Sequence, residues 1–139
     1  MVDQNCASCV EGDLVAKFGI KICELETSKV YLFKEQSHPG RCIVAHKKHV
    51  GDMNELTAEE RAAYFEDVAR VARAIMKAFN PDKVNYGAYG DTGHHLHFHL
   101  CPKYKDEYEW GGVFLMNPDK KYLTDEEYAD MIEKIKANL

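Results

Sequence analysis

The sequence predicts an α+β fold, with a central antiparallel five-stranded sheet, one long helix and one C-terminal helix. Short apolar or β-branched segments bounded by Gly, Pro, Ser or Asp predict the strands, and two segments with apolar residues at helical spacing predict the helices. Strands dominate the middle of the chain, which favours an antiparallel sheet over alternating βαβ units. Because the chain has 139 residues and no repeat or linker, we expect a single domain spanning residues 1–139.

Five segments are expected to be strands. Four of them cover residues 17–25, 30–33, 41–46 and 83–89, and the fifth is the histidine-rich stretch 94–102. Pro102 suits the end of a strand, because proline cannot donate a hydrogen bond to a neighbouring strand.

Both predicted helices begin with the same capping box. In Thr57-Ala58-Glu59-Glu60 the Thr57 hydroxyl accepts from the amide three residues on, and the Glu60 carboxylate accepts from the amide of Thr57. The apolar stripe that follows consists of Phe65, Val68, Ala69, Ala72, Ile75, Met76 and Phe79, and Asn80-Pro81 ends it. Thr124-Asp125-Glu126-Glu127 repeats the box before a shorter stripe of Tyr128, Met131, Ile132 and Ile135. We expect both helices to serve in packing and not in catalysis.

The composition excludes several classes of protein. With 18 Lys and Arg against 23 Asp and Glu, the net charge is −5, which argues against non-specific nucleic-acid binding. No window approaches the ~18 apolar residues of a membrane span, and residues 1–13 do not resemble a signal peptide. We therefore expect a cytoplasmic protein without membrane or nucleic-acid partners. In that reducing setting, Cys6-x-x-Cys9 suggests metal or redox chemistry before a disulfide.

The histidine-rich stretch carries the main functional signal. In a strand, His95, His97 and His99 share one face, while the intervening Leu96, Phe98 and Leu100 take the other, apolar face. This pattern has three interpretations: a solvated face that is rich in histidine, a three-histidine metal site, and nucleophilic catalysis. In the last, one imidazole attacks while the neighbouring imidazoles transfer protons and stabilise charge. Upstream, the Gly-rich stretch 85–93 can bring backbone N–H groups close to an anion.

The stretch from His95 to Cys101 resembles the His-φ-His-φ-His-φ-φ signature (φ apolar) of the histidine triad family of nucleotide hydrolases and transferases. Pro39–Val44 is similar to the family's Pro-Gly-His strand, and Lys47–Val50 to its Lys-Lys-His turn. The resemblance covers roughly residues 6–104, and a C-terminal loop and helix follow over residues 105–139. It implies the histidine triad fold.

The resemblance implies a mechanism in which His97 attacks the α-phosphorus and forms a nucleotidyl-histidine intermediate that water later hydrolyses. His99 would assist the leaving group. Asn85, Gly90 and Thr92 match the family's phosphate and leaving-group contacts. No catalytic metal is implied, because the imidazole is itself the nucleophile.

Two residues depart from the family pattern. Arg41 stands where the family has a histidine, which changes the local charge, because a guanidinium cannot accept a hydrogen bond. Asp91 replaces the usual Gln and puts an anion near the expected phosphate. The family's acid for the ribose hydroxyls has no clear match; Glu35 is the nearest candidate, and a solvated turn carboxylate is an equal alternative.

Cys6 and Cys9 are half of a tetrahedral zinc site. Bacterial members similar to this chain complete such a site with two histidines, which correspond to His49 and His95. The resemblance therefore implies a structural zinc that fixes the N-terminal segment to the sheet, and it leaves His97 and His99 free. His46 is an alternative to His49.

The remaining histidines and cysteines are expected to have ordinary structural places. His38, His46 and His94 are expected in turns or at the surface, and the other thiols, Cys23, Cys42 and Cys101, as buried small residues.

The resemblance implies that a homodimer forms through the long helix and one strand. The implied substrate is a purine nucleotide conjugate, either a nucleoside phosphoramidate or a dinucleoside polyphosphate. One alternative is a nucleotide-binding protein with weak activity, which the departures at Arg41 and Asp91 suggest. The other is a metalloprotein that uses all three strand histidines.

Overall fold

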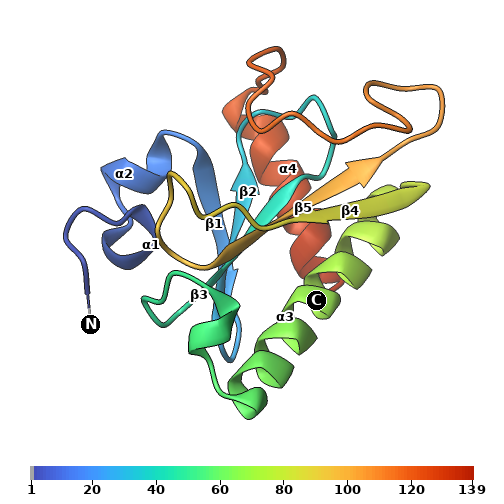
Figure 1. The fold of residues 1–139 in the computed structure, drawn as a ribbon. Helices are drawn as coiled ribbons and strands as arrows, with labels where there is room; N and C mark the ends of the chain where they lie inside the picture. Colours follow the sequence, from blue (N-terminus) through green and yellow to red (C-terminus); the bar gives the residue numbers. More distant parts are fainter. Residues whose placement is uncertain (1) are drawn as a thin grey trace.

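A five-stranded sheet forms the centre of the computed structural model, which describes residues 2–139 (Figure 1). All neighbouring strands are antiparallel, and their order is β1-β2-β3-β5-β4. The strands are β1 (Gly19–Glu24), β2 (Ser28–Phe33), β3 (Cys42–His46), β4 (Lys83–Gly87) and β5 (His97–Lys103). The predicted α+β fold with a five-stranded antiparallel sheet is confirmed.

Two of the helices are the ones that the sequence predicts, α3 (Ala58–Phe79) and α4 (Asp125–Ala137). Each begins at a complete capping box. Thr57 and Glu60 exchange two hydrogen bonds at the start of α3, as Thr124 and Glu127 do at the start of α4. Three short elements that the sequence analysis did not predict are α1 (Ala7–Val10), α2 (Asp13–Ala16) and the 3-10 helix η1 (Met53–Glu55).

The two faces of the sheet have different partners. Val30, Val44 and Leu100 belong to the main hydrophobic core, where α3 and α4 cover them. The opposite face carries a smaller cluster formed by Tyr31, Phe33, Ile43, Ala45 and Val15, against which Ala7 of α1 packs. Ala45 pairs with His97 and Ile43 pairs with His99, so both histidines lie on this second face.

The regular part of the histidine strand is shorter than predicted. β5 begins at His97, so His95 lies just outside it. The His95 amide donates to the Gly93 carbonyl in a turn, and the Leu96 amide donates to Val50 over 2.7 Å. The chain is therefore still tied to the segment after β3 at this point, but without regular strand pairing.

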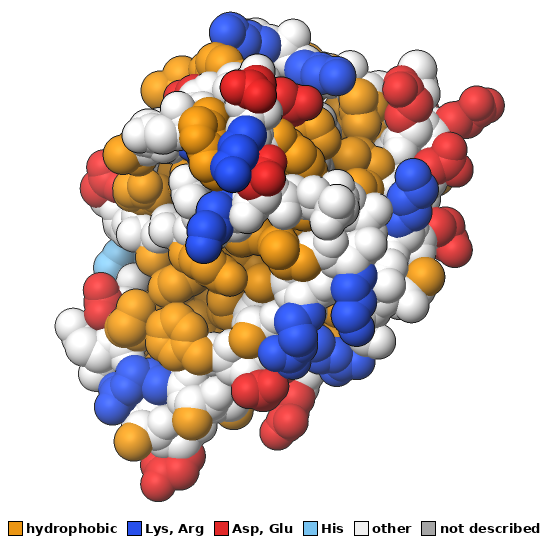
Figure 2. Space-filling view, turned by 90° about the vertical axis from the view of Figure 1, so that its right-hand side faces the viewer, with side chains coloured by type: hydrophobic (Ala, Val, Ile, Leu, Met, Phe, Trp, Pro, Cys, Tyr) orange, Lys and Arg blue, Asp and Glu red, His pale blue; other side chains and the backbone are white. Residues whose placement is uncertain are grey.

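The apolar stripe of α3 is only partly buried. Val68, Ala72 and Ile75 are buried as expected, whereas Phe65 and Met76 are 37% and 40% exposed. The face of α3 that is buried against the sheet differs slightly from the predicted stripe, because it includes Tyr64, which is fully buried. Figure 2, which looks onto the side of the molecule that carries α3 and β4, shows hydrophobic side chains gathered there between charged ones.

None of the helices found within residues 2–139 combines the length and the apolar character that a membrane crossing requires.

Candidate functional site

A large cavity lies on the face of the sheet opposite α3 and α4. Its volume is about 940 Å³, and its walls come from α1, β2, β3, β5, the loop before β5 and the segment after Gly112. His97 and His99 are part of the lining. The histidines of β5 therefore face a space large enough for a small-molecule ligand.

His97 has one ring nitrogen fixed by the backbone. Its Nδ1 lies 2.7 Å from the carbonyl oxygen of His95, and because a carbonyl can only accept, Nδ1 donates the proton. In the neutral imidazole, Nε2 then carries the free lone pair. Gly93 lies beside the ring, where a Cβ would come within 3.4 Å of Cε1 of His97. The arrangement suits a nucleophile or base that acts through Nε2.

His99 is held as a neutral hydrogen-bond donor. It is 4% exposed, and its ring centroid lies 5.3 Å from that of His97. The Arg41 guanidinium donates to its Nδ1 over 3.0 Å, which leaves the proton of the neutral ring on Nε2. Burial, with the positive charge of Arg41 as the next cause, lowers the pKa of His99 to about 3. At neutral pH this imidazole is therefore uncharged.

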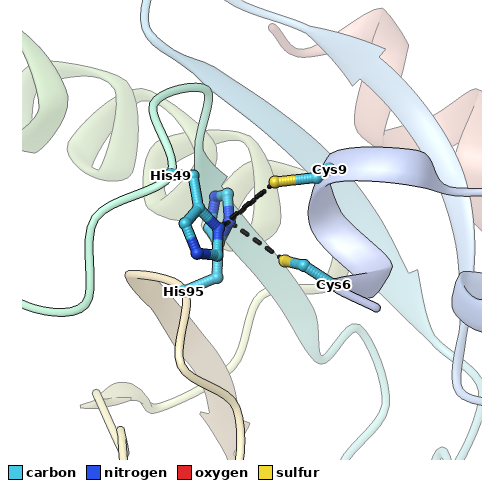
Figure 3. A group of neighbouring side chains, drawn as sticks. All are labelled: Cys6, Cys9, His49 and His95. Carbon is cyan, nitrogen blue, oxygen red and sulfur yellow. Dashed lines mark hydrogen bonds between the residues drawn. The ribbon is translucent and has the colours of Figure 1, made fainter. Parts of the chain in front are cut away.

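Two cysteines and two histidines converge beside the cavity (Figure 3). One ligand atom from each of Cys6, Cys9, His49 and His95 lies within 4.8 Å of all the others. The Cys6 Sγ is 3.2 Å from the His95 Nδ1, and the Cys9 Sγ is 3.2 Å from the His49 Nδ1. A tetrahedral zinc ion with ordinary bond lengths separates its ligand atoms by roughly 3.3–3.8 Å. The four residues therefore fit a Cys₂His₂ metal site.

Outer contacts orient the two imidazoles of this cluster. The His95 Nε2 lies 2.6 Å from the carbonyl oxygen of His46, so Nε2 donates and Nδ1 is left unprotonated toward the sulfur atoms. An Asp3 carboxylate oxygen lies 3.9 Å from the His49 Nε2. Because the His95 carbonyl also accepts from His97, His95 connects the cluster to the histidine with the free Nε2.

The Gly-rich loop reaches the cavity only in part. Thr92 lines the cavity, whereas Gly90 and Asn85 are not in its lining. In the register of the sheet, Gly87 pairs with His99, and Asn85 lies one pleat further away. Asn85 borders a separate cavity of about 320 Å³. Of the three residues predicted to contact phosphate, only Thr92 lines the same cavity as His97 and His99.

The sequence analysis missed two parts of the cavity wall. Phe33 and Ile43 line the cavity with His99, and strand alternation is a signal that could have found them, because they lie on the histidine face. The second part is the segment 113–117, which has no regular structure and gave no periodic signal. Its Phe114 ring lies 6.4 Å from that of His99.

Glu35 is neither a solvated turn residue nor part of the cavity lining. It is 2% exposed, and its carboxylate accepts hydrogen bonds from the amides of Ser37, Lys120 and Lys121. The expectation of a solvated turn carboxylate was therefore wrong, because this carboxylate connects the C-terminal segment to the chain after β2. The ribose contact stays a prediction.

The other histidines and cysteines differ in part from expectation. His94 is exposed, but His38 and His46 are buried, against the Glu109 carboxylate and the Lys48 amide respectively. His49, and not the alternative His46, joins the cluster. Cys42 and Cys101 are buried as predicted, and Cys23 is half-buried.

Comparison with known proteins gives a consistent result. A family model of the HIT domain matches residues 19–106. Protein hit of Bacillus subtilis is 29% identical over 123 residues, which are 84% of this chain and 83% of that protein. The adenosine 5′-monophosphoramidase of Schizosaccharomyces pombe is 29% identical over 116 residues, with 77% and 80% covered. A bis(5′-adenosyl)-triphosphatase of Dictyostelium discoideum is 28% identical over 76 residues, 51% of each chain.

Solved structures share the fold. A histidine triad protein from Sinorhizobium meliloti superposes with a TM-score of 0.84 at 23% identity, covering 92% of this chain and 95% of that one. A zinc-bound histidine triad family protein from Mycobacterium smegmatis gives a TM-score of 0.69 at 22% identity, with 96% and 94% covered.

Proposed function

The chain belongs to the HIT domain family, and from this premise we propose that it is a histidine triad nucleotide hydrolase that cleaves nucleoside phosphoramidates at the α-phosphate. The observation that carries the proposal is the hydrogen bond from the His97 Nδ1 to the His95 carbonyl, which leaves the Nε2 lone pair free in a cavity. The name of the S. pombe relative, an adenosine 5′-monophosphoramidase, supports this substrate class. The name of the D. discoideum relative, a bis(5′-adenosyl)-triphosphatase, supports only the broader class of nucleotide conjugates.

The proposed reaction has two displacements at phosphorus. In the first, the His97 Nε2 forms a bond to the α-phosphorus while the bond from phosphorus to the leaving amine breaks. The Nε2–H of His99, one pleat away, donates a hydrogen bond to a phosphoryl oxygen or to the departing nitrogen. In the second, water attacks phosphorus and the N–P bond breaks. The leaving nitrogen takes up a proton from solvent in the first displacement and departs as the amine, and the attacking water returns one proton to solvent in the second.

The purine nucleoside would lie against the apolar wall of the cavity. Phe18, Phe33 and Ile43 provide aromatic and aliphatic surface on the histidine side of the sheet. Thr92, which also lines the cavity, supplies a hydroxyl group. The phosphate contacts of Asn85 and Gly90 stay predictions, because neither residue lines this cavity.

The charges around the cavity favour a phosphoramidate over a dinucleoside polyphosphate. Among the described residues that line it there is no Lys or Arg, and Asp3 and Asp91 contribute carboxylates. A polyphosphate bridge brings several negative charges, which such a lining does not neutralise. One α-phosphate with an amine leaving group is easier to accommodate.

The test is turnover of adenosine 5′-phosphoramidate and of diadenosine triphosphate by the wild-type protein and by His97→Ala. We expect the phosphoramidate to be cleaved faster, and His97→Ala to lower kcat by about three orders of magnitude or more. A nucleotidyl adduct on His97, trapped by mass spectrometry, would identify the intermediate. Equal turnover by His97→Ala would contradict the mechanism.

A second candidate function is nucleotide binding with little turnover. Asp91 supports it, because its carboxylate lines the cavity close to where phosphate is expected. Tight binding of AMP without turnover of either conjugate would favour this function. In that case Asp91→Gln, which restores the residue usual in the family, is expected to raise the rate.

For the cluster, we propose a structural zinc bound by Cys6, Cys9, His49 and His95. The ligand-atom distances fit zinc, and the zinc-bound relative from M. smegmatis supports the assignment. A bound zinc would supply a cross-link between α1 and the sheet, and no catalytic step. His97 and His99 are not part of the cluster found in residues 2–139, which argues against the three-histidine site.

Metal analysis tests this assignment. The double variant Cys6→Ser, Cys9→Ser is expected to lose zinc, whereas Cys23→Ser, which removes a thiol outside the cluster, is expected to keep it. Zinc retained in the double variant but lost in His97→Ala would instead support a site on the strand histidines.

We also propose a homodimer that pairs the side of the molecule formed by α3 and β4. β4 is an edge strand of the sheet, and the exposed side chains of Phe65, Met76 and Tyr86 lie on these two elements. The placement of all 139 residues in one domain, the cytoplasmic location and the absence of membrane and nucleic-acid partners stay predictions.

A further inference from the structure

Arg41 is a charged side chain that the fold buries completely. It directly precedes β3 and is 0% exposed. Its guanidinium lies between two aromatic rings, 4.1 Å from the centroid of Phe33 and 4.9 Å from that of Phe114. Burial of a charge is costly unless its hydrogen-bonding groups are satisfied. The partners of this guanidinium therefore indicate what it does.

Its donors are directed at four acceptor atoms, none of which belongs to a carboxylate; the weakest acceptor is the Met116 Sδ, 3.5 Å from Nη2. Nη2 donates to the Nδ1 of His99 over 3.0 Å and to the carbonyl of Met116 over 2.9 Å, and Nη1 donates to the carbonyl of Leu115 over 3.2 Å. Within the described part of the chain, Arg41 takes part in no ion pair, and its Nε has no partner. The buried guanidinium thus donates its hydrogen bonds to an imidazole and to the backbone of one segment.

We propose that Arg41 is a positioning residue for the reaction: it fixes His99 as the neutral tautomer with its proton on Nε2, and it holds residues 115–116 as the cavity wall beside that ring. This inference rests on the proposed function, which gives His99 a part in the chemistry. Arg41 does not line the cavity, so it acts through His99 and the wall and does not touch the substrate.

The geometry disfavours every other protonation state of His99. A proton on Nδ1 would place an N–H against the N–H of Arg41 across 3.0 Å. An imidazolium would place two positive charges in contact where water cannot screen them. The titratable groups that act on His99 are Arg41, from the start of β3, and His97, from its own strand, and both oppose its protonation. The Nε2–H is therefore available at every pH at which the protein is folded and the His99 imidazole is uncharged.

The same guanidinium sets the position of the wall. Leu115 and Met116 belong to an irregular segment that lines the cavity, and Arg41 donates to both of their carbonyls. One side chain thus controls the donor on His99 and the surface next to it. Loss of Arg41 is therefore expected to change kcat and KM together, whereas loss of the His99 donor alone would change mainly kcat.

The first measurement needs no substrate. ¹⁵N NMR of the histidine side chains in the wild-type protein is expected to show His99 with a protonated Nε2 and an unprotonated Nδ1, and no titration between about pH 5 and pH 8. His99 protonated on Nδ1 in the wild-type protein would overturn the proposal, whatever the variants do.

Three variants sharpen the test. Arg41→Met removes the charge and the donors at similar length, and we expect His99 to titrate at a pH about one unit higher or more, with both tautomers populated. Arg41→Lys retains a charge and one donor group and should give an intermediate result. Lys103→Met is the matched control, because Lys103 is 2% exposed and donates to the carbonyls of Glu109 and Gly112. An unchanged His99 in folded Arg41→Met, or an equal change in Lys103→Met, would contradict the proposal.

Kinetics separate this inference from the proposed function. With adenosine 5′-phosphoramidate, Arg41→Met is expected to lower kcat about tenfold or more and to raise KM, with partial rescue in Arg41→Lys. Wild-type kcat and KM in Arg41→Met would overturn the positioning role. If the wild-type protein turns over no nucleotide conjugate, the proposed function fails, and the NMR result still decides whether Arg41 sets the tautomer of His99.

Discussion

Three different groups of His95 make contacts with other residues. Its Nδ1 faces the two cysteines, its Nε2 donates to His46, and its carbonyl accepts from His97. The sequence could predict the first role, since the spacing of Cys6 and Cys9 and the resemblance both point to it. It could not predict the third, because a backbone carbonyl is present in every residue and only the bend before β5 aims this one at His97.

The buried, neutral His99 makes the stability of the protein dependent on pH. Its pKa of about 3 in the folded chain lies below the ordinary value of 6.5. The unfolded chain therefore binds more protons as the pH falls below 6.5, and stability is lost over that range. We expect His99 to account for up to about 2 kcal/mol of the loss in unfolding free energy between pH 7 and pH 5.

Urea unfolding at the two pH values, with His99→Gln for comparison, measures this contribution. The variant is expected to lose less stability on acidification than the wild-type protein. An identical pH dependence in the two proteins would show that His99 is not buried in its neutral form.

At the scale of elements, the helix starts were the most predictable features. The four residues of each capping box are adjacent in sequence, so Thr57 and Thr124 form the bonds that the sequence predicts. The short helices α1 and α2 were not predicted, because four residues are too few for a periodic signal. Segment 113–117 was not predicted either, because it has no regular structure. Its backbone is held by the nearby Glu109 and by Arg41, which is distant in sequence.

Removal of the cap of α3 tests the contribution of its capping box. Thr57→Ala leaves the Glu60 amide without its partner and is expected to lower the unfolding free energy by about 1 kcal/mol. Thr57→Ser, which keeps the hydroxyl, is the matched control and should remain within about 0.5 kcal/mol of the wild-type protein. Chemical denaturation measures both; equal losses in the two variants would assign the effect to the lost methyl group and not to the cap.

The attachment of α1 is expected to depend on the metal. Ala7 packs against the sheet, and Lys29 of β2 donates to the Ser8 carbonyl. The Cys6–His95 and Cys9–His49 approaches are the further links that a bound metal would turn into covalent cross-links. Chelation of the zinc is expected to raise amide hydrogen exchange in residues 6–10 about tenfold or more, with little change in α3. An unchanged exchange rate in residues 6–10 after chelation would mean that the cluster does not hold α1.

At the scale of the whole molecule, the five-stranded antiparallel sheet and the face that carries His97 and His99 were predicted, because side chains alternate along a strand. The order of the strands was not predicted, because alternation does not determine which strands are neighbours. The partial exposure of the α3 stripe was not predicted either. Phe65 and Met76 were expected in the core because periodicity identifies an apolar face and does not say what covers it. A second copy of the chain would account for both residues.

The proposed homodimer can be tested by substitution on that face. Met76→Glu combined with Tyr86→Glu places charges on side chains that are 40% and 52% exposed, and it is expected to give monomers in sedimentation analysis. Tyr122→Glu is the control, because Tyr122 is similarly exposed, at 55%, but lies just before α4. A wild-type protein that is monomeric at all accessible concentrations would refute the dimer.

The distribution of the five thiols provides a direct reporter of metal occupancy. Burial raises the pKa of Cys101 to about 12 and that of Cys42 still further, and it also raises that of Cys23, so these three thiols are expected to react slowly with alkylating or disulfide reagents. Cys6 and Cys9 are half-buried, as Cys23 is, and bound zinc would mask them in addition. A simple colorimetric thiol titration should therefore gain two equivalents on chelation, which gives a quality check on each purified batch without elemental analysis.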